Sequence, residues 1–473
     1  MKKKLAGIIA VAMVAVMLAA CGIIGTEPLD PWYEPERPTT AGFTETISGF
    51  GGRNIHIVTA NYWLFNYGLN PDETPNETLA IMRQMRNIED DYNITFTFEP
   101  LPAGAGIRDN MIASRMVGDT PYDLVNMDLT HTNIRQFIQH ELFLPVDHPS
   151  VRAVIGLDAQ PWAEAGRLTT FGTNQYGVHF LMANGGTTLH SVLTFNRDFM
   201  HSFDVGNFYE MMFNMEWTWD AFETAGRSIM QQSNNTITSL IVGRELYFVP
   251  AFMKSNGGYV VRQTVTGFDF VGYENDAFLE TLEFLARLNQ EGMIIEDSEN
   301  VATRAAAGEA LFISGTYEYL RAFTRGEIQT PYSWGLLPIP MGPRMNDYVA
   351  AQFTADIWFI PNGIAAPYEV ATVLVAMANR LSKINIIETE LEYGLLDYES
   401  IQVMEMLLDR IVIDYSRSLA DTRVNLTREI NTVFAGTVTP VVAMQRIGHP
   451  VQSALNQFLP FICRNCSYCL LLR

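Results

Sequence analysis

Two periodicities alternate in the first part of the chain, and their order restricts the fold more than any other feature. Residues 55–59 and 94–98 alternate apolar and polar side chains, as β-strands do, and a third short strand is expected at 122–125. Between these strands, apolar residues recur every three or four positions over 77–92 and about 107–117, which indicates amphipathic helices. This βαβαβ order predicts a parallel sheet covered by helices, with ligands gathering at the carboxyl ends of its strands.

The second half of the chain repeats the same alternation. Thr218 or Asp220 can cap a helix that runs to about Gln231, and a further amphipathic helix is expected over 278–288. Three more strands are expected, at 193–196, 310–313 and 334–337. The repetition predicts an α/β protein with two lobes.

The first residues have the form of a bacterial lipoprotein signal. Three lysines at 2–4 precede an apolar run from Leu5 to Ala20, and small residues end this run directly before Cys21. The run is shorter than the roughly 20 apolar residues of a comfortable membrane span. Similarity to lipoprotein signals implies cleavage before Cys21, a lipid on its sulfur and acylation of the new amino terminus. The alternative is an uncleaved membrane helix.

Composition predicts a folded body behind this signal. With 473 residues, 48% of them hydrophobic and 18% charged, the chain can build a large core and more than one domain. Its formal net charge of −21 argues against nucleic acid and against anionic lipid headgroups as partners, so contact with the membrane is expected through the lipid anchor only. Residues 21–50 are rich in proline and predict a flexible linker.

Three further cysteines, Cys463, Cys466 and Cys469, lie close to the end of the chain. Three thiolates at this spacing can ligate zinc or an iron–sulfur cluster, but a structural site usually takes four ligands, and no histidine lies nearby. We interpret residues 460–473 as a disordered tail carrying thiols, and a reading-frame error near the end is the alternative. Neither a metal nor a cofactor is expected.

Motifs of catalysis are missing from the sequence. It contains no Gly-x-Ser-x-Gly, no His-Glu-x-x-His and no glycine loop of the phosphate-binding type, and its eight histidines are scattered. The separation between two carboxylates that defines a glycosidase cannot be obtained from sequence. A binding protein is therefore favoured over an enzyme, with a membrane-anchored, polysaccharide-active enzyme as the alternative.

A series of short motifs resembles the extracellular solute-binding proteins of sugar-type ABC importers, of the maltose-binding type. Trp217-Thr218-Trp219-Asp220 is the most distinctive, and we interpret its two tryptophans as structural residues at a helix start. The other motifs follow in the order of the family, at 120–125, 176–178, 195–196, 257–258, 308–312, 334–340 and 347–348. The similarity covers roughly residues 55–459, behind the lipoprotein signal.

The resemblance implies a periplasmic-binding-protein fold of type II, in which hinge strands join two lobes of mainly parallel sheet. Signal peptide 1–20 and linker 21–50 would precede the lobes. Lobe 1 would hold 51–172 plus about 350–400, and lobe 2 would hold 173–349 plus about 410–459. Crossings are expected near 172–178, near 348–359 and between 394 and 418.

The resemblance also implies a function. A monomer, anchored on the extracytoplasmic face of the cell membrane, would close over a small solute, a sugar or oligosaccharide, and present it to the transmembrane permease subunits of an ABC importer. The same patterns fit the ligand-binding component of a sensor system.

Five residues are candidates for solute contact, because carbohydrate is bound by aromatic platforms with carboxylate or amide partners. Tyr317 follows a strand-ending glycine, where maltose-type proteins stack an aromatic residue on sugar; half-buried packing is the alternative. Trp63 follows the first strand and can instead cap the core of the lobe. Asp128 follows the third strand and can instead cap the helix beyond it. Asp356 and Trp358 lie in the second expected crossing.

Overall fold

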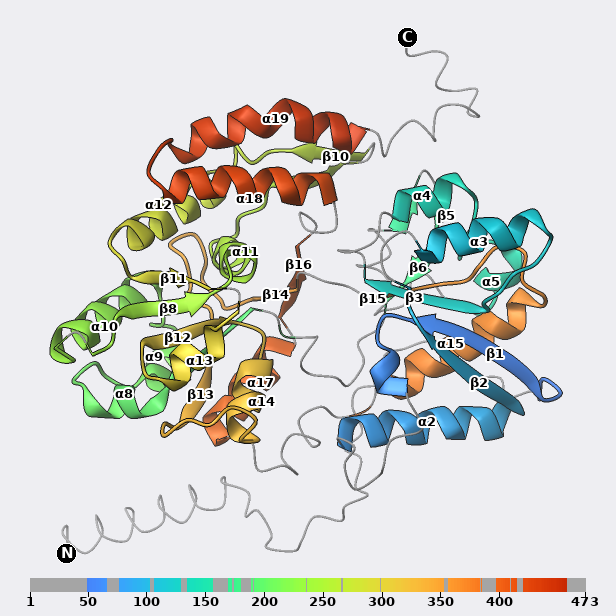
Figure 1. Cartoon of the computed structure of the whole chain (residues 1–473), viewed down its shortest axis with the longest axis horizontal. Helices are drawn as coiled ribbons and strands as arrows, with labels where there is room; N and C mark the ends of the chain where they lie inside the picture. The colour runs from blue at the N-terminus through green and yellow to red at the C-terminus, as the bar shows by residue number, and fades with distance from the viewer. Residues whose placement is uncertain are drawn as a thin grey trace, which may run out of the picture. The chain divides into compact units, whose positions relative to one another are not determined.

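A computed structural model contains two five-stranded sheets, each flanked by helices (Figure 1). It describes residues 49–65, 76–102, 106–128, 134–155, 169–171, 174–179, 189, 191–234, 236–264, 267–297, 299–352, 356–382, 384, 397–408, 410–414 and 420–456. The expected signal peptide, Cys21, most of the linker and the cysteine tail lie outside these residues. The two sheets and the helices packed on them are called the first and the second lobe below.

The sheet of the first lobe has the strand order β2-β1-β3-β15-β6. Strands β1 (Arg53–Thr59), β2 (Ile94–Pro100) and β3 (Leu124–Asp128) are parallel, and α2 (Asn76–Tyr92) and α3 (Gly106–Met116) connect them. The predicted βαβαβ order is therefore present. Strand β15 (Asp356–Phe359), from much later in the chain, pairs antiparallel with both β3 and β6 (Gly177–Val178).

Strand alternation divides the side chains of this lobe between two cores. On one face, strand residues pack with α2 and with α15 (Pro367–Leu381); they include Ile55, Ile57, Leu124 and Trp358. On the other face, strand residues pack with α3 and with α4 (Ile134–Gln139); they include Val58, Val125, Met127, Ile357 and Phe359.

The sheet of the second lobe has the order β11-β8-β12-β7-β13. Three of its strands run parallel, namely β8 (Ser239–Gly243), β11 (Ile294–Glu296) and β12 (Ala310–Gly315). Strand β7 (Val192–Asn196) runs antiparallel to its neighbours β12 and β13 (Trp334–Pro338). The sequence predicted β7, β12 and β13 but neither β8 nor β11.

Among the described residues of this lobe are six long helices: α10 (Trp219–Gln232), α11 (Glu245–Ser255), α12 (Asp276–Gln290), α17 (Tyr398–Leu408), α18 (Ala420–Phe434) and α19 (Pro440–Asn456). Shorter elements complete the described chain: η1 (Tyr62–Phe65), α5 (Pro149–Arg152), β4 (Thr170–Phe171), β5 (Asn174–Gln175), α8 (Arg197–Ser202), α9 (Phe208–Phe213), β9 (Val261–Thr264), β10 (Gly267–Phe270), α13 (Val301–Ala306), α14 (Glu318–Thr324), β14 (Ala350–Gln352) and β16 (Ile411–Ile413).

In the order of the described elements, the chain passes between the two lobes three times. It leaves β6 of the first sheet for β7 of the second, returns from β14 to β15, and leaves α15 for α17, which packs against β13. Strand β14 pairs in parallel with β16. The lobe boundaries expected from the sequence stay predictions, because residues 172–173, 353–355 and 385–396 lie outside the described part of the chain.

The Trp-Thr-Trp-Asp motif forms the start of α10. Thr218 is the N-cap, since its side-chain oxygen accepts a hydrogen bond from the Ala221 N–H at 3.3 Å. The Trp217 indole N–H donates to the carbonyl oxygen of Pro338 at 3.0 Å, and that of Trp219 donates to the Ser255 hydroxyl at 3.2 Å. Both rings are buried in the core of the second lobe. Their interpretation as structural residues is confirmed.

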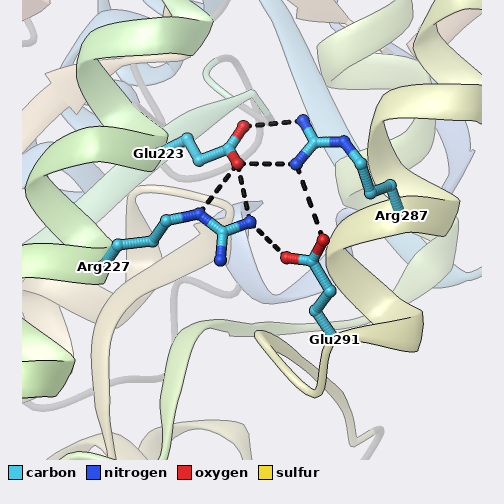
Figure 2. Close-up of polar contacts among 4 residues, drawn as sticks. All are labelled: Glu223, Arg227, Arg287 and Glu291. Atoms are coloured by element: carbon cyan, nitrogen blue, oxygen red, sulfur yellow. Dashed lines mark hydrogen bonds and ion pairs between the residues drawn. The ribbon is translucent and has the colours of Figure 1, made fainter.

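An ion network joins α10 to α12 on the surface of this lobe (Figure 2). The Glu223 carboxylate lies between two guanidinium groups and accepts hydrogen bonds from Arg287 at 2.6 and 2.7 Å and from Arg227 at 2.7 and 2.9 Å. Arg227 also bonds Glu291 at the end of α12. The hydrogen bonds from Arg287, together with those from Arg227, lower the pKa of Glu223.

Replacement of Glu223 by glutamine is expected to lower the free energy of unfolding by about 1 kcal/mol near neutral pH. The side chains of Arg227 and Arg287 are 42% and 46% exposed, so water screens the interaction and a larger effect is not expected. Because the pKa of Glu223 is lower in the folded state, its contribution is complete above the unfolded pKa of about 4.3. The contribution is lost as the pH falls through the folded value.

Urea unfolding of both chains over a pH series from neutral downwards measures this difference. Glu283→Gln is the matched control, because it removes the same charge from an exposed position of α12. It is expected to change stability little at any pH. A Glu223→Gln difference that does not shrink on acidification would contradict the ionic origin of the effect.

Candidate functional site

Four of the five candidate residues belong to one edge of the first sheet. Strands β1 and β3 end there, and the antiparallel β15 begins there, so the register places Asp356 opposite Asp128. Trp358 pairs with Asn126 one step further into the sheet. Trp63 lies in η1, which follows β1 directly. Residues from three separate stretches of sequence thus meet at the carboxyl edge, where parallel sheets bind ligands.

Trp358 forms part of the buried layer beneath this edge. Its side chain has no exposed surface, and its ring meets Phe65 of η1 edge-on at a centroid distance of 6.2 Å. Phe65 stacks in turn on Phe98 of β2 at 4.9 Å. These contacts fix η1 against the sheet. In this conformation Trp358 is a packing residue beneath the edge. Direct contact of Trp358, Trp63, Asp128 and Asp356 with solute stays a prediction.

A short chain of hydrogen bonds runs along the same edge. The backbone N–H of Asn61 donates to the Thr59 hydroxyl oxygen at 3.0 Å, and that hydroxyl donates to the Asn126 Oδ1 at 2.8 Å. Thr59 and Asn126 have no exposed surface, and Asn61 is nearly as buried. Sequence analysis missed Thr59 and Asn126. Asn126 had a usable signal, because it is a polar residue between Val125 and Met127, which are both buried.

Tyr317 belongs to the carboxyl edge of the second sheet, two residues beyond the end of β12. It is wholly buried in the core of that lobe, its N–H donates to the Leu189 carbonyl oxygen at 3.2 Å, and the Arg321 guanidinium lies over its ring at 5.7 Å. A ring without exposed surface presents no face to a solute. The structure therefore favours the packing alternative in this conformation, and stacking on sugar stays a prediction.

Tyr319, two residues further on, is a half-buried aromatic residue of this edge. Burial raises the pKa of Tyr319, while the nearby Arg244 opposes this rise and Tyr247 adds to it, so the three side chains lie close together. Gly315 makes room for the ring, because a Cβ there would lie 2.6 Å from a Tyr319 ring carbon. Arg244 follows the end of β8 directly, and Tyr319 follows the end of β12 closely, so both residues lie near strand ends.

Sequence analysis missed this second cluster for a simple reason. Strand β8 is a short run of buried residues without alternation, which periodicity cannot distinguish from a helical segment. Because β8 was not predicted, the position of Arg244 at the end of a strand could not be predicted either. The sequence shows two tyrosines, Tyr317 and Tyr319, after the end of β12. It does not show which of them is buried, because this depends on how α14 packs.

The two edges offer complementary chemistry. The first carries carboxylate and amide groups, which accept hydrogen bonds from hydroxyl groups, and the second carries a guanidinium group beside two phenols. Within the described ranges, no group of three or more His, Cys, Asp or Glu side chains could hold a metal ion. These residues are suited to binding a polar solute with apolar faces.

Several solved structures of solute-binding proteins have a fold similar to that of this chain. The sugar-binding protein MalE from Xanthomonas citri is 13% identical, with a TM-score of 0.59 over 85% of this chain and 98% of its own. The GacH receptor of Streptomyces glaucescens, solved with acarbose, is 13% identical, with a TM-score of 0.56 over 86% and 99%. UgpB from Mycobacterium tuberculosis, solved with glycerophosphocholine, is 14% identical, with a TM-score of 0.56 over 86% and 100%.

These likenesses show the fold: two lobes of mixed α/β structure, as in type II periplasmic binding proteins. The predicted fold class is therefore confirmed. Comparison with curated protein sequences gives no match. The model of one family, described as bacterial extracellular solute-binding protein, matches residues 86–379. Since this match spans more than half of the sequence, the chain belongs to the bacterial extracellular solute-binding proteins.

Proposed function

We propose that the protein captures a sugar or oligosaccharide between its two lobes and delivers it to the permease of an ABC importer. The observation that carries this proposal is the meeting of Asp128 and Asp356 at the carboxyl edge of the first sheet, in a chain of the solute-binding family. Carboxylates are the acceptors that sugar hydroxyl groups need. Two of the similar structures, MalE and GacH, are described with sugar or acarbose.

Delivery would depend on a difference in contacts between two conformations. A solute that touches the carboxylates of the first lobe and the Tyr319 cluster of the second stabilises the closed form, because only that form makes both sets of contacts. The permease would recognise the closed form. No bond of the solute is broken in this scheme, and the protein acts as a monomer.

The location forms part of the same proposal. Within the described ranges, no helix combines the length and apolarity needed to cross a membrane. We place the protein on the extracytoplasmic face, held by a lipid on Cys21 after removal of residues 1–20. Metabolic labelling with a fatty acid tests this, since Cys21→Ser is expected to abolish incorporation.

Thermal unfolding of the detergent-solubilised full chain, with a panel of solutes, tests the proposal. The panel holds maltose, maltotetraose, acarbose, glycerophosphocholine and amino acids. A solute bound only by the folded state adds about 2.7 kcal/mol of stability at a hundredfold excess over its dissociation constant, and therefore raises Tm. A rise with sugars alone is expected. A rise with glycerophosphocholine alone would reassign the solute class, and a rise with amino acids alone would overturn the proposal.

Loss of one carboxylate is expected to weaken sugar binding by about tenfold to a hundredfold, since a hydrogen bond to a charged group contributes about 1.5–3 kcal/mol. Asp356→Asn makes this change with little loss of volume. Isothermal titration calorimetry with the sugar that raises Tm most measures the dissociation constant. Asp269→Asn, an exposed carboxylate in β10, is the matched control and should leave the constant unchanged. Equal affinities for all three chains would remove Asp356 from the site.

A further inference from the structure

The helix α11 begins at the carboxyl edge of the second sheet, directly after β8. Its N-cap is Arg244, a half-buried residue whose side chain makes no capping hydrogen bond. Residues with a side-chain oxygen are preferred at an N-cap, because they accept hydrogen bonds from the first N–H groups of the helix. A guanidinium group has donors only, and a helix N-terminus already carries a partial positive charge. An anion at the start of α11 would therefore be attracted by both charges.

The Ser314 side chain lies on the same side of the sheet as α11. Ser314 of β12 pairs with Gly243, the residue before Arg244. A Cβ at Gly243 would lie 3.4 Å from the Cβ of Ser314 and 3.6 Å from the Cδ1 of Phe248 in α11, so both side chains flank this glycine. Ser314 is 1% exposed, and its Oγ has no hydrogen-bond partner among the described residues. A buried hydroxyl group in this state is a donor that a ligand can use.

A second buried hydroxyl group belongs to the same side of this edge. The register pairs Ser314 with Leu193, and Ser191 lies two residues before Leu193, in the same phase of the strand alternation. Ser191 is also 1% exposed, and its Oγ likewise lacks a partner within the described ranges. Thr194 has an unpartnered hydroxyl too, but it pairs with Ile313 inside the sheet and faces the opposite side. Of these three residues, the two serines therefore lie at strand ends on the side of α11.

All of these groups favour a negatively charged ligand. The first N–H groups of an α-helix have no acceptor within the helix, and such an N-terminus binds phosphate or carboxylate groups. Arg244 supplies a full positive charge and a planar set of donors, which match two oxygens of a carboxylate or a phosphate. We propose that the start of α11 binds an anionic group of the solute, with Arg244 as its charge partner and the Ser314 hydroxyl as a donor.

This inference rests on the proposed function and narrows the solute to acidic sugars. The first edge is proposed to accept hydrogen bonds from neutral hydroxyl groups, whereas the start of α11 holds an anionic substituent. Burial raises the pKa of the nearby Tyr319, so its phenol stays protonated and adds a further donor. The carboxylate of a sugar acid and the phosphate of a sugar phosphate share the required chemistry, and affinity measurements distinguish them.

Inorganic phosphate tests the anion site without any sugar. Thermal unfolding of the detergent-solubilised full chain is compared in sodium phosphate and in sodium chloride of equal ionic strength. Because phosphate stabilises folded proteins in general, the quantity compared between chains is the gain in Tm from chloride to phosphate. This gain is expected to be about 2 °C smaller for Arg244→Gln than for the native chain.

Arg262→Gln is the matched control, because it removes the same charge from an exposed position of β9. It should gain as much stability from phosphate as the native chain does. Equal gains in all three chains would overturn the proposal.

Three sugars that differ only at C6 identify the anionic group. Isothermal titration calorimetry compares glucose with glucuronate and with glucose 6-phosphate. We expect one of the two anionic sugars to bind about tenfold to a hundredfold more tightly than glucose, and Arg244→Gln to remove this advantage. Tighter binding of glucuronate would assign a sugar acid, and tighter binding of glucose 6-phosphate would assign a sugar phosphate. Binding of glucose as tightly as both anionic sugars would overturn the proposal.

Two further variants separate binding from folding. Ser314→Ala removes an unsatisfied donor, so its ligand-free Tm should stay within about 2 °C of the native value, while its affinity for the preferred anionic sugar falls by about threefold to tenfold. Arg244→Lys keeps the charge without the planar set of donors, and should retain part of the advantage over glucose. A lower ligand-free Tm of Ser314→Ala with unchanged affinity would show that this hydroxyl is structural, and would overturn its role in the site.

The two proposals can fail separately. If no sugar raises Tm but the phosphate gain depends on Arg244, the proposed function fails and the anion site stands. If sugars bind, but neither the phosphate gain nor the preference for an anionic sugar depends on Arg244, only the anion site fails.

Discussion

Trp217→Ala is expected to lower the free energy of unfolding by about 3–5 kcal/mol, the largest effect of any single change considered for this protein. The Trp217 indole has no exposed surface, and its ring lies 5.1, 6.0 and 5.7 Å from the rings of Phe208, Phe222 and Phe312. Truncation would leave a cavity among these aromatic rings. It would also leave the Pro338 carbonyl oxygen without its indole donor.

Urea unfolding followed by circular dichroism measures the loss. Trp217→Phe serves as the matched variant, because it keeps much of the ring volume and removes only the hydrogen bond and the outer ring. It is expected to lose about 1–2 kcal/mol. If Trp217→Ala and Trp217→Phe lost the same amount, the cavity would not be the main cause. A loss below about 1 kcal/mol for alanine would contradict the close packing of this core.

The second large effect is expected for Asp397→Ala, at about 2–4 kcal/mol. The Asp397 carboxylate accepts hydrogen bonds from the Tyr209 hydroxyl at 3.1 Å, from the Ser400 N–H at 2.8 Å and from the Ser400 hydroxyl at 2.9 Å. It also pairs with Arg197 at 3.2 Å. Burial raises the pKa of Tyr209, and the charge of Asp397 adds to the rise, so the phenol stays protonated as a donor.

This network ties the start of α17 to β13 at the point where the chain returns to the second lobe. The Ser400 hydroxyl accepts the Leu336 N–H of β13 at 2.9 Å, so the loss of Asp397 also releases the group that holds that strand. Removing the carboxylate leaves several buried donors unpaired. The Arg197 side chain is 28% exposed and that of Asp397 is 14% exposed, which keeps the effect below that of a fully buried pair.

Two further variants separate charge from hydrogen bonding. Asp397→Asn keeps an oxygen that can accept from the Ser400 N–H but removes the charge, and is expected to lose about half as much stability. A double-mutant cycle with Arg197→Met isolates the ion pair. A coupling energy near zero in urea unfolding would show that Arg197 does not stabilise the folded state through Asp397. Equal losses for Asp397→Ala and Asp397→Asn would assign the whole effect to charge.

Local periodicity was sufficient to predict much of this fold. The helices α2 and α12 and the strands β1 and β2 have apolar residues that repeat at helix or strand spacing. The strands β12 and β13 are short apolar runs that are buried at every position. Caps are local as well, which is why Thr218 was among the two expected starts of α10. The repeated alternation of strands and helices predicted two lobes. The family motifs, which are recognised as short stretches of sequence in a fixed order, implied the same.

Tertiary structure decided how these elements combine into an edge. Asp128 and Asp356 come together only because β15 inserts antiparallel between β3 and β6, a long-range pairing that no local pattern encodes. Burial of Tyr317 and partial exposure of Tyr319 follow from the packing of α14 at the end of β12. Likewise, Thr59 and Asn126 become a hydrogen-bonded pair only once their strands lie side by side. Hydrophobic pattern depends on near neighbours in the chain, whereas a binding edge depends on pairings between distant segments.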